Sequence, residues 1–206
     1  MSIERWFELM RAFGFGANEE TFDSLRAAYS EKHRHYHTGE HVQACLRHLD
    51  SCVMRADEPK EIELALWFHD AIYEPLSSNN ERKSADWAAA FLAANLATPE
   101  VAARVHRLIM VTEHNAATMT KDESILVDID LSILGADVET YAAFEEAVRN
   151  EYRMVPMLIY RRKRTEILNG FLKRPRIYQN EPFFSEREQQ ARINLSNAIS
   201  KLSARA

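Results

Sequence analysis

Residues 64–75 read LALWFHDAIYEP, an apolar run that carries His69 and Asp70 in its interior. A continuous apolar run of this kind is typical of a core helix, and we expect a buried helix from Glu61 to Tyr73. An imidazole and a carboxylate inside such a helix are costly to desolvate unless other groups pair with them. The imidazole of a lone buried histidine is usually hydrogen-bonded to a neighbouring side chain or to the backbone. A functional interpretation therefore requires partners from elsewhere in the chain.

The remaining sequence predicts an all-α protein. Of 206 residues only five are Gly and six are Pro, and 46% are hydrophobic, which is ample for one core. No internal repeat or linker composition divides the chain, so one domain is expected. Apolar stripes at helical spacing predict further helices at Ile3–Phe13, Thr21–Tyr29, Glu81–Leu96, Glu139–Met154 and Pro156–Leu172, with others starting at Pro99 and at a Ser185–Glu188 capping box.

The net charge and the cysteine content limit the classes of binding partner and the cellular compartment that are expected. The net charge of −5 argues against a nucleic-acid-binding protein or a protein of anionic membranes. No apolar stretch is long enough to span a bilayer, and the N-terminus lacks a signal-peptide pattern. Cys45 and Cys52 lie seven residues apart in one helical pattern, too far apart to bridge, so reduced thiols and a cytoplasmic location are expected.

Four of the eight histidines fall in residues 33–41, HRHYHTGEH. Thr38 is a suitable N-cap for the following apolar stripe, which places His41 in the first turn of a core-facing helix and His37 in the loop before it. The two earlier histidines fit a solvated turn. His41 does not, because its neighbours Val42 and Cys45 face the core.

A second apolar segment also carries acids. Residues 125–135 read ILVDIDLSILG, and no solvent-facing side is apparent for Asp128 and Asp130. Two residues apart on a helix, these side chains point in different directions, so at most one of them is expected to bind a ligand directly.

The polar residues carried by apolar segments form one candidate site: His41, His69, Asp70 and Asp130. Two imidazoles and two carboxylates suit a divalent ion such as Mn, Mg, Fe, Co, Ni or Zn, and differ from the cysteine-rich set of structural zinc. Such an ion would offset the buried negative charge and leave coordination positions for water and substrate.

The order His, His-Asp, Asp on helices resembles the HD-domain superfamily of metal-dependent phosphohydrolases. YHTGEH is similar to the opening motif of its cyclic-nucleotide phosphodiesterase branch, and WFHDAIYEP, NNERKSA and DIDLSILG strengthen the match. Together with EYRMVP and ARINLSNAI, these segments resemble small bacterial predicted phosphohydrolases over nearly the whole chain. The resemblance implies one HD-type helical domain over residues 1–206, with a metal-site core at about 33–135 and C-terminal helices at about 139–204.

The resemblance also implies roles for individual residues. It makes His41, His69, Asp70 and Asp130 the metal ligands. Asp130 is preferred to Asp128, because the last aspartate of the family usually falls at the second acid. His37 takes the position of the histidine that protonates the leaving group in the phosphodiesterase branch. The second-metal pattern of that branch is incomplete here, so a cyclic-nucleotide substrate does not follow.

The expected function is hydrolysis of a small phosphorylated substrate, with a nucleotide as one candidate, by metal-activated water. Its catalytic residues would be His37, Asp70 and Glu81, the last orienting water or a ligand from the start of its helix. Lys83 or Arg82 could contact phosphate, or be ordinary exposed charges. His114 could reach a second metal or the substrate. The alternatives are a metal-binding regulatory or ligand-binding module without turnover, and a two-iron oxygenase.

Overall fold

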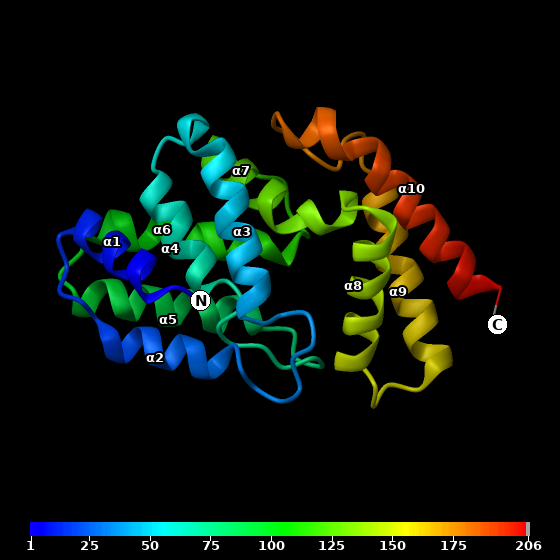
Figure 1. Ribbon diagram of the computed structural model, residues 1–206, viewed down its shortest axis with the longest axis horizontal. Helices are drawn as coiled ribbons and strands as arrows, with labels where there is room; N and C mark the ends of the chain where they lie inside the picture. The colour runs from blue at the N-terminus through cyan, green and yellow to red at the C-terminus, as the bar shows by residue number, and fades with distance from the viewer. Residues whose placement is uncertain (205–206) are drawn as a thin grey trace. The chain divides into compact units, whose positions relative to one another are not determined.

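The computed structural model describes residues 1–204, and every regular element in this range is a helix (Figure 1). The predicted all-α class is therefore confirmed. The helices group into two compact units, Met1–Val127 and Asp128–Ala206. The single HD-type domain, with its core at 33–135, stays a prediction.

The first unit is packed around one apolar helix. Its elements are α1 (Ile3–Phe13), α2 (Glu19–Ala28), α3 (Gly39–Cys52), η1 (Val53–Arg55), α4 (Pro59–Phe68), α5 (Asn80–Ala94), α6 (Pro99–Met110) and η2 (Val111–Glu113), followed by α7 (Lys121–Asp130), which continues past the unit's end. Helix α4 contacts α1, α3, α5 and α6, and its residues 64–68 are all 0% exposed. Burial on every side explains why this segment shows no polar face.

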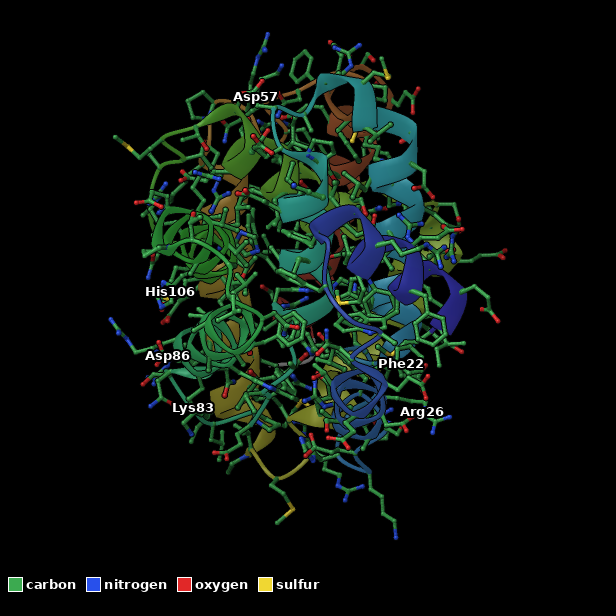
Figure 2. The ribbon with its side chains drawn as sticks, turned by 90° about the vertical axis from the view of Figure 1, so that its left-hand side faces the viewer. Phe22, Arg26, Asp57, Lys83, Asp86 and His106 are labelled. Carbon is green, nitrogen blue, oxygen red and sulfur yellow. The ribbon has the colours of Figure 1, made fainter. Side chains whose placement is uncertain are left out.

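Aromatic side chains hold α1 and α2 against this central helix. The rings of Trp6 and Trp67 meet edge to face at 5.5 Å, and Phe22 lies 6.1 Å from Trp67. Figure 2 shows Phe22 and Arg26 on α2, and Phe22 is buried whereas the Arg26 side chain is 63% exposed. The amphipathic stripe predicted for this helix thus packs against α4.

Helices α5 and α6 pack along each other and meet at the surface through an ion pair. His106 Nε2 lies 3.1 Å from Asp86 Oδ1 (Figure 2). Lys83, three residues before Asp86, lies on the same exposed side of α5. Its position is that of an ordinary exposed charge, which was one of the two interpretations made from the sequence.

The second unit consists of η3 (Leu131–Gly135), α8 (Val138–Glu151), α9 (Met157–Leu172) and α10 (Phe183–Ser203). Helix α10 packs against η3 and α9. The buried Asn194 of α10 donates to the carbonyl oxygens of Leu134 and Ala136 at 2.9 and 2.8 Å, satisfying backbone groups at the end of η3. Amide bonds of this kind fix the register between helix and turn.

Several predicted helix boundaries are wrong, among them the end of α8, which lies at Glu151 rather than Met154. Helix α4 ends at Phe68 rather than Tyr73. The Ser185–Glu188 capping box does not form, because α10 already begins at Phe183. The Glu188 carboxylate accepts from the backbone N–H groups of Ile177 and Tyr178 instead, at 2.9 and 3.1 Å. Its side chain therefore satisfies the preceding loop and is not available to cap its own helix.

Two other expectations concern thiols and membranes. Cys45 and Cys52 are both buried thiols and are not joined in a disulfide, as predicted. Among the described residues, every helix is too short or too polar to be a candidate for crossing a bilayer.

Candidate metal centre

His69 and Asp70 lie where α4 ends. His69 is the C-cap residue, and its Nδ1 lies 2.9 Å from the carbonyl oxygen of Leu66. Because a carbonyl can only accept, Nδ1 carries the proton and Nε2 presents its lone pair. A backbone bond of this type commonly orients a metal-binding histidine. His69 is 1% exposed, so its Nε2 is held in place by the rigid end of the core helix.

His41 comes from the first turn of α3. Thr38 is the N-cap, as predicted, and its side chain accepts from the Glu40 N–H at 3.3 Å. His41 is buried, and its Nε2 lies 3.1 Å from His69 Nε2. Helix capping and the core-facing stripe of α3 therefore bring His41 to the end of α4.

Asp70 completes a close trio with these two imidazoles. Its Oδ2 lies 3.0 Å from His69 Nε2 and 3.6 Å from His41 Nε2. Ligands bound about 2.1 Å from one ion lie roughly 3.0–3.4 Å apart at octahedral or tetrahedral angles. The distances from His69 Nε2 to Asp70 Oδ2 and to His41 Nε2, 3.0 and 3.1 Å, fall in this range, whereas the 3.6 Å between His41 Nε2 and Asp70 Oδ2 is slightly longer.

The charges in this trio favour an ionised carboxylate. Burial raises the pKa of the Asp70 carboxyl, but the neighbouring imidazoles, chiefly that of His69, outweigh it and hold the pKa below its usual range. Asp70 is thus available as an anionic oxygen ligand.

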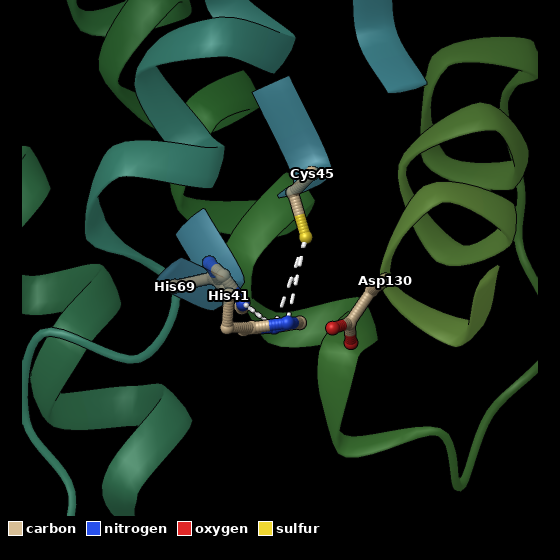
Figure 3. A group of neighbouring side chains, drawn as sticks. All are labelled: His41, Cys45, His69 and Asp130. Carbon is tan, nitrogen blue, oxygen red and sulfur yellow. Dashed lines mark hydrogen bonds between the residues drawn. The ribbon is translucent and has the colours of Figure 1, made fainter. Parts of the chain in front are cut away.

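A second group, which shares both histidines with this trio but does not include Asp70, could hold a metal ion. The possible ligand atoms of His41, Cys45, His69 and Asp130 lie within 4.8 Å of one another, and Figure 3 shows these four side chains. Asp130 is the last residue of α7. Within the first unit, the predicted ligands His41, His69 and Asp70 lie together, and their binding of a metal stays a prediction.

Asp128 has a different role. It is fully buried and accepts from the backbone N–H groups of Gln179 and Asn180, at 2.9 and 2.6 Å. The side-chain amide of Asn180 also donates to Asp128 Oδ2, at 2.9 Å. Burial raises the pKa of Asp128 to about 6, although the hydrogen bonds from these donors act to lower this pKa. The carboxylate holds the loop before α10 through these three donors.

The sequence interpretation missed Cys45. Its Sγ lies 3.7 Å from His41 Nε2 and 3.8 Å from Nδ1, so it contacts the imidazole without favouring the nitrogen that faces His69. The signal for it was present, because residues four apart share one face of a helix. The position of the sulfur favours a neighbour of the site rather than a ligand.

Replacing Cys45 by Ala should therefore change zinc affinity less than about tenfold, below the 10–100-fold that is typical of losing an outer contact of a metal site. Competition with a chromophoric chelator measures this affinity. Cys52→Ala is the matched control, since Cys52 is also buried on α3 but lies outside the group. A loss far above 100-fold in Cys45→Ala alone would instead make the thiolate a ligand.

Aromatic rings form a wall beside the trio. His37 stacks on Tyr73 with ring centroids 4.1 Å apart, and lies edge-on to His41 at 6.2 Å. Tyr36 packs against His41 at 4.7 Å. His37, the predicted proton donor, thus lies next to a predicted ligand, with its ring plane fixed by Tyr73.

Arg34 was also missed by the sequence interpretation. Its side chain is 0% exposed and donates to the carbonyl oxygens of His37, Asp70 and Ala71 at 3.1, 2.6 and 3.0 Å. One guanidinium therefore ties the loop before α3 to the end of α4. These bonds satisfy two carbonyl oxygens just beyond the C-terminal end of α4.

Glu81 and His114 lie in the surroundings of Asp70. Burial raises the pKa of Glu81, with the charges of Asp70 and Glu113 adding to this effect and His114 opposing it. Glu81 lies in the first turn of α5, as predicted. His114 has a left-handed backbone, with φ of 56°, and lies outside the metal-ligating group found among the described residues. A non-glycine residue in this conformation is strained.

Comparison of the chain with models of protein families, with curated proteins and with solved structures gives no match. The resemblance to the HD-domain superfamily therefore depends on the sequence motifs alone. The function has to be inferred from the chemistry of the site.

Proposed function

We propose that this protein is a metal-dependent phosphohydrolase of the HD type, acting on a small phosphorylated substrate. The observation that carries the proposal is the convergence of His41 Nε2, His69 Nε2 and Asp70 Oδ2 within 3.6 Å. The Leu66 carbonyl fixes the His69 ring so that Nε2 lies 3.0 Å from the ionised Asp70 carboxylate. A divalent cation bound here would take the place of the proton on Nε2 and be held by the imidazole and the carboxylate together.

The proposed ligands are His41, His69, Asp70 and Asp130, with Cys45 beside them. Imidazole and carboxylate ligands suit Mn, Fe, Co, Ni, Zn or Mg, and a nucleotide is one candidate substrate. Four protein ligands leave coordination positions of a six-coordinate ion for water and phosphate. When bound, the ion would lower the pKa of a water molecule and offset negative charge on the phosphoryl oxygens.

The protein's own groups would orient the substrate and move the protons. His37, held by its stack on Tyr73, would give a proton to the leaving oxygen, a step for which imidazole is suited near neutral pH. Glu81 would orient the attacking water from the first turn of α5. Arg34 would keep His37 and Asp70 in register through their backbone carbonyls.

The test is phosphate release from a panel of phosphomonoesters and nucleotides after removal of metals with EDTA. The stripped protein should be inactive, and one or more divalent ions should restore turnover by at least about 100-fold, as expected if the ion supplies the nucleophile. A bound metal without turnover on any substrate would support the regulatory or ligand-binding module. Two irons per chain together with oxygen consumption would support an oxygenase.

A further inference from the structure

The second unit contains a groove of about 510 Å³ lined by residues of α8, α9 and α10. This volume is in the range of small-molecule sites. Its apolar lining comes from Val138, Tyr141, Ala142, Met157, Ala198 and Leu202. Val138 and Met157 are 58% and 44% exposed. Exposed apolar side chains around a hollow are typical of binding surfaces. No lining residue belongs to the metal centre.

Tyr160, which also lines the groove, carries an unsatisfied hydroxyl. The residue is 7% exposed, and among the described residues its buried oxygen has no hydrogen-bond partner. Buried polar groups are nearly always paired in proteins, so this hydroxyl calls for an acceptor or donor from outside the chain.

The neighbouring acid cannot serve as that partner. Glu145 accepts from the Tyr141 hydroxyl at 2.7 Å and from Arg164 at 2.8 and 3.1 Å. Its carboxylate is thereby neutralised and its hydrogen-bonding capacity is largely used. Glu145 therefore leaves the Tyr160 hydroxyl without a partner among the described residues.

The charges around the groove favour an anion. Arg149, Arg161 and Lys201 line it, against the acids Glu145 and Glu146. Because Arg164 neutralises Glu145, the net charge around the groove is positive. The guanidinium of Arg149 also lies over the Tyr160 ring, 4.7 Å from its centroid, next to the unsatisfied phenol.

We propose that this groove binds an apolar monocarboxylate of medium chain length. Its hydrocarbon chain would lie against the apolar lining, and one carboxylate oxygen would accept from the Tyr160 hydroxyl. Arg149 and Lys201 would supply the attraction for the negative charge. This site is independent of the proposed hydrolase activity.

Octanoate is the probe, titrated into the full-length protein by calorimetry, with octanol and octylammonium compared at equal concentrations. Octanoate should bind saturably with one site per chain, and at least about tenfold more tightly than octylammonium. Ala142→Trp should fill the groove and abolish binding. Ala143→Trp is the matched control, since Ala143 is equally exposed on α8 but does not line the groove. Circular dichroism verifies that both variants fold.

Tyr160→Phe removes only the hydroxyl and tests the polar contact. It should weaken octanoate at least fivefold and leave the weaker binding of octanol unchanged. The proposal is overturned if octanoate shows no saturable binding, or if it binds Ala142→Trp as tightly as Ala143→Trp. Equal affinity of Tyr160→Phe and the unaltered protein for octanoate would overturn the assigned role of the hydroxyl.

Discussion

Asp70→Asn should lower metal-dependent phosphate release by at least about 100-fold, more than the 10–100-fold typical of losing an outer contact of a metal site. The Asp70 carboxylate lies 3.0 and 3.6 Å from the two imidazole nitrogens that face it. Asparagine keeps the volume but removes the negative charge that a divalent ion requires. Initial rates and metal content per chain measure the effect.

A suitable control for this change is Asp86→Asn. Asp86 pairs with His106 at the surface of the same unit, and its side chain is 61% exposed. Its removal should leave phosphate release within about twofold, because surface ion pairs contribute little. If Asp70→Asn keeps its helical content but also keeps full metal binding and turnover, Asp70 is not a ligand and the proposed centre is wrong.

The elements that could be predicted from sequence are those specified by local chemistry. Thr38 caps α3 and Thr98 caps α6, each through its own hydroxyl, and both helices follow an apolar stripe. The direction of His41 into the core followed from the same stripe. These features can be predicted from sequence because each capping residue lies within one helical turn of the helix end that it stabilises.

The features that were missed depend on residues distant in sequence. The turn after α4 is bound by Arg34, which lies 36 positions before Asp70 and donates to its carbonyl oxygen. No local pattern near residues 64–75 reveals that contact. Similarly, Glu188 accepts hydrogen bonds from the backbone N–H groups of Ile177 and Tyr178. The capping-box rule considers only residues within one helix turn and therefore could not predict these contacts.

The choice between the two aspartates of α7 combines both kinds of information. Helical spacing indicated that Asp128 and Asp130 point in different directions. The Asp128 carboxylate is already hydrogen-bonded by a loop, which supplies three donors from Gln179 and Asn180. That loop lies some 50 positions away, so the family resemblance, not the spacing, was the basis for preferring Asp130.

Arg34→Met should destabilise the first unit by roughly 3 kcal/mol or more, since a buried polar group without a partner costs about 1–3 kcal/mol. Methionine retains an apolar stem of similar length but leaves the carbonyl oxygens of His37, Asp70 and Ala71 without their buried donor. Equilibrium unfolding in urea measures the loss. Phosphate release should fall in parallel at saturating metal, because the loop with His37 and the turn with Asp70 are no longer tied together.

Two further variants separate a positioning role from general damage. Arg26→Met removes an exposed arginine of α2 and should change the free energy of unfolding by no more than about 0.5 kcal/mol. Arg34→Lys keeps the charge but cannot replace the guanidinium fork, which divides its nitrogens between the carbonyls of Asp70 and Ala71. It should therefore restore part of the stability and little of the turnover. Full turnover in Arg34→Lys would show that the fork does not position the site, and would leave Arg34 a role in stability alone.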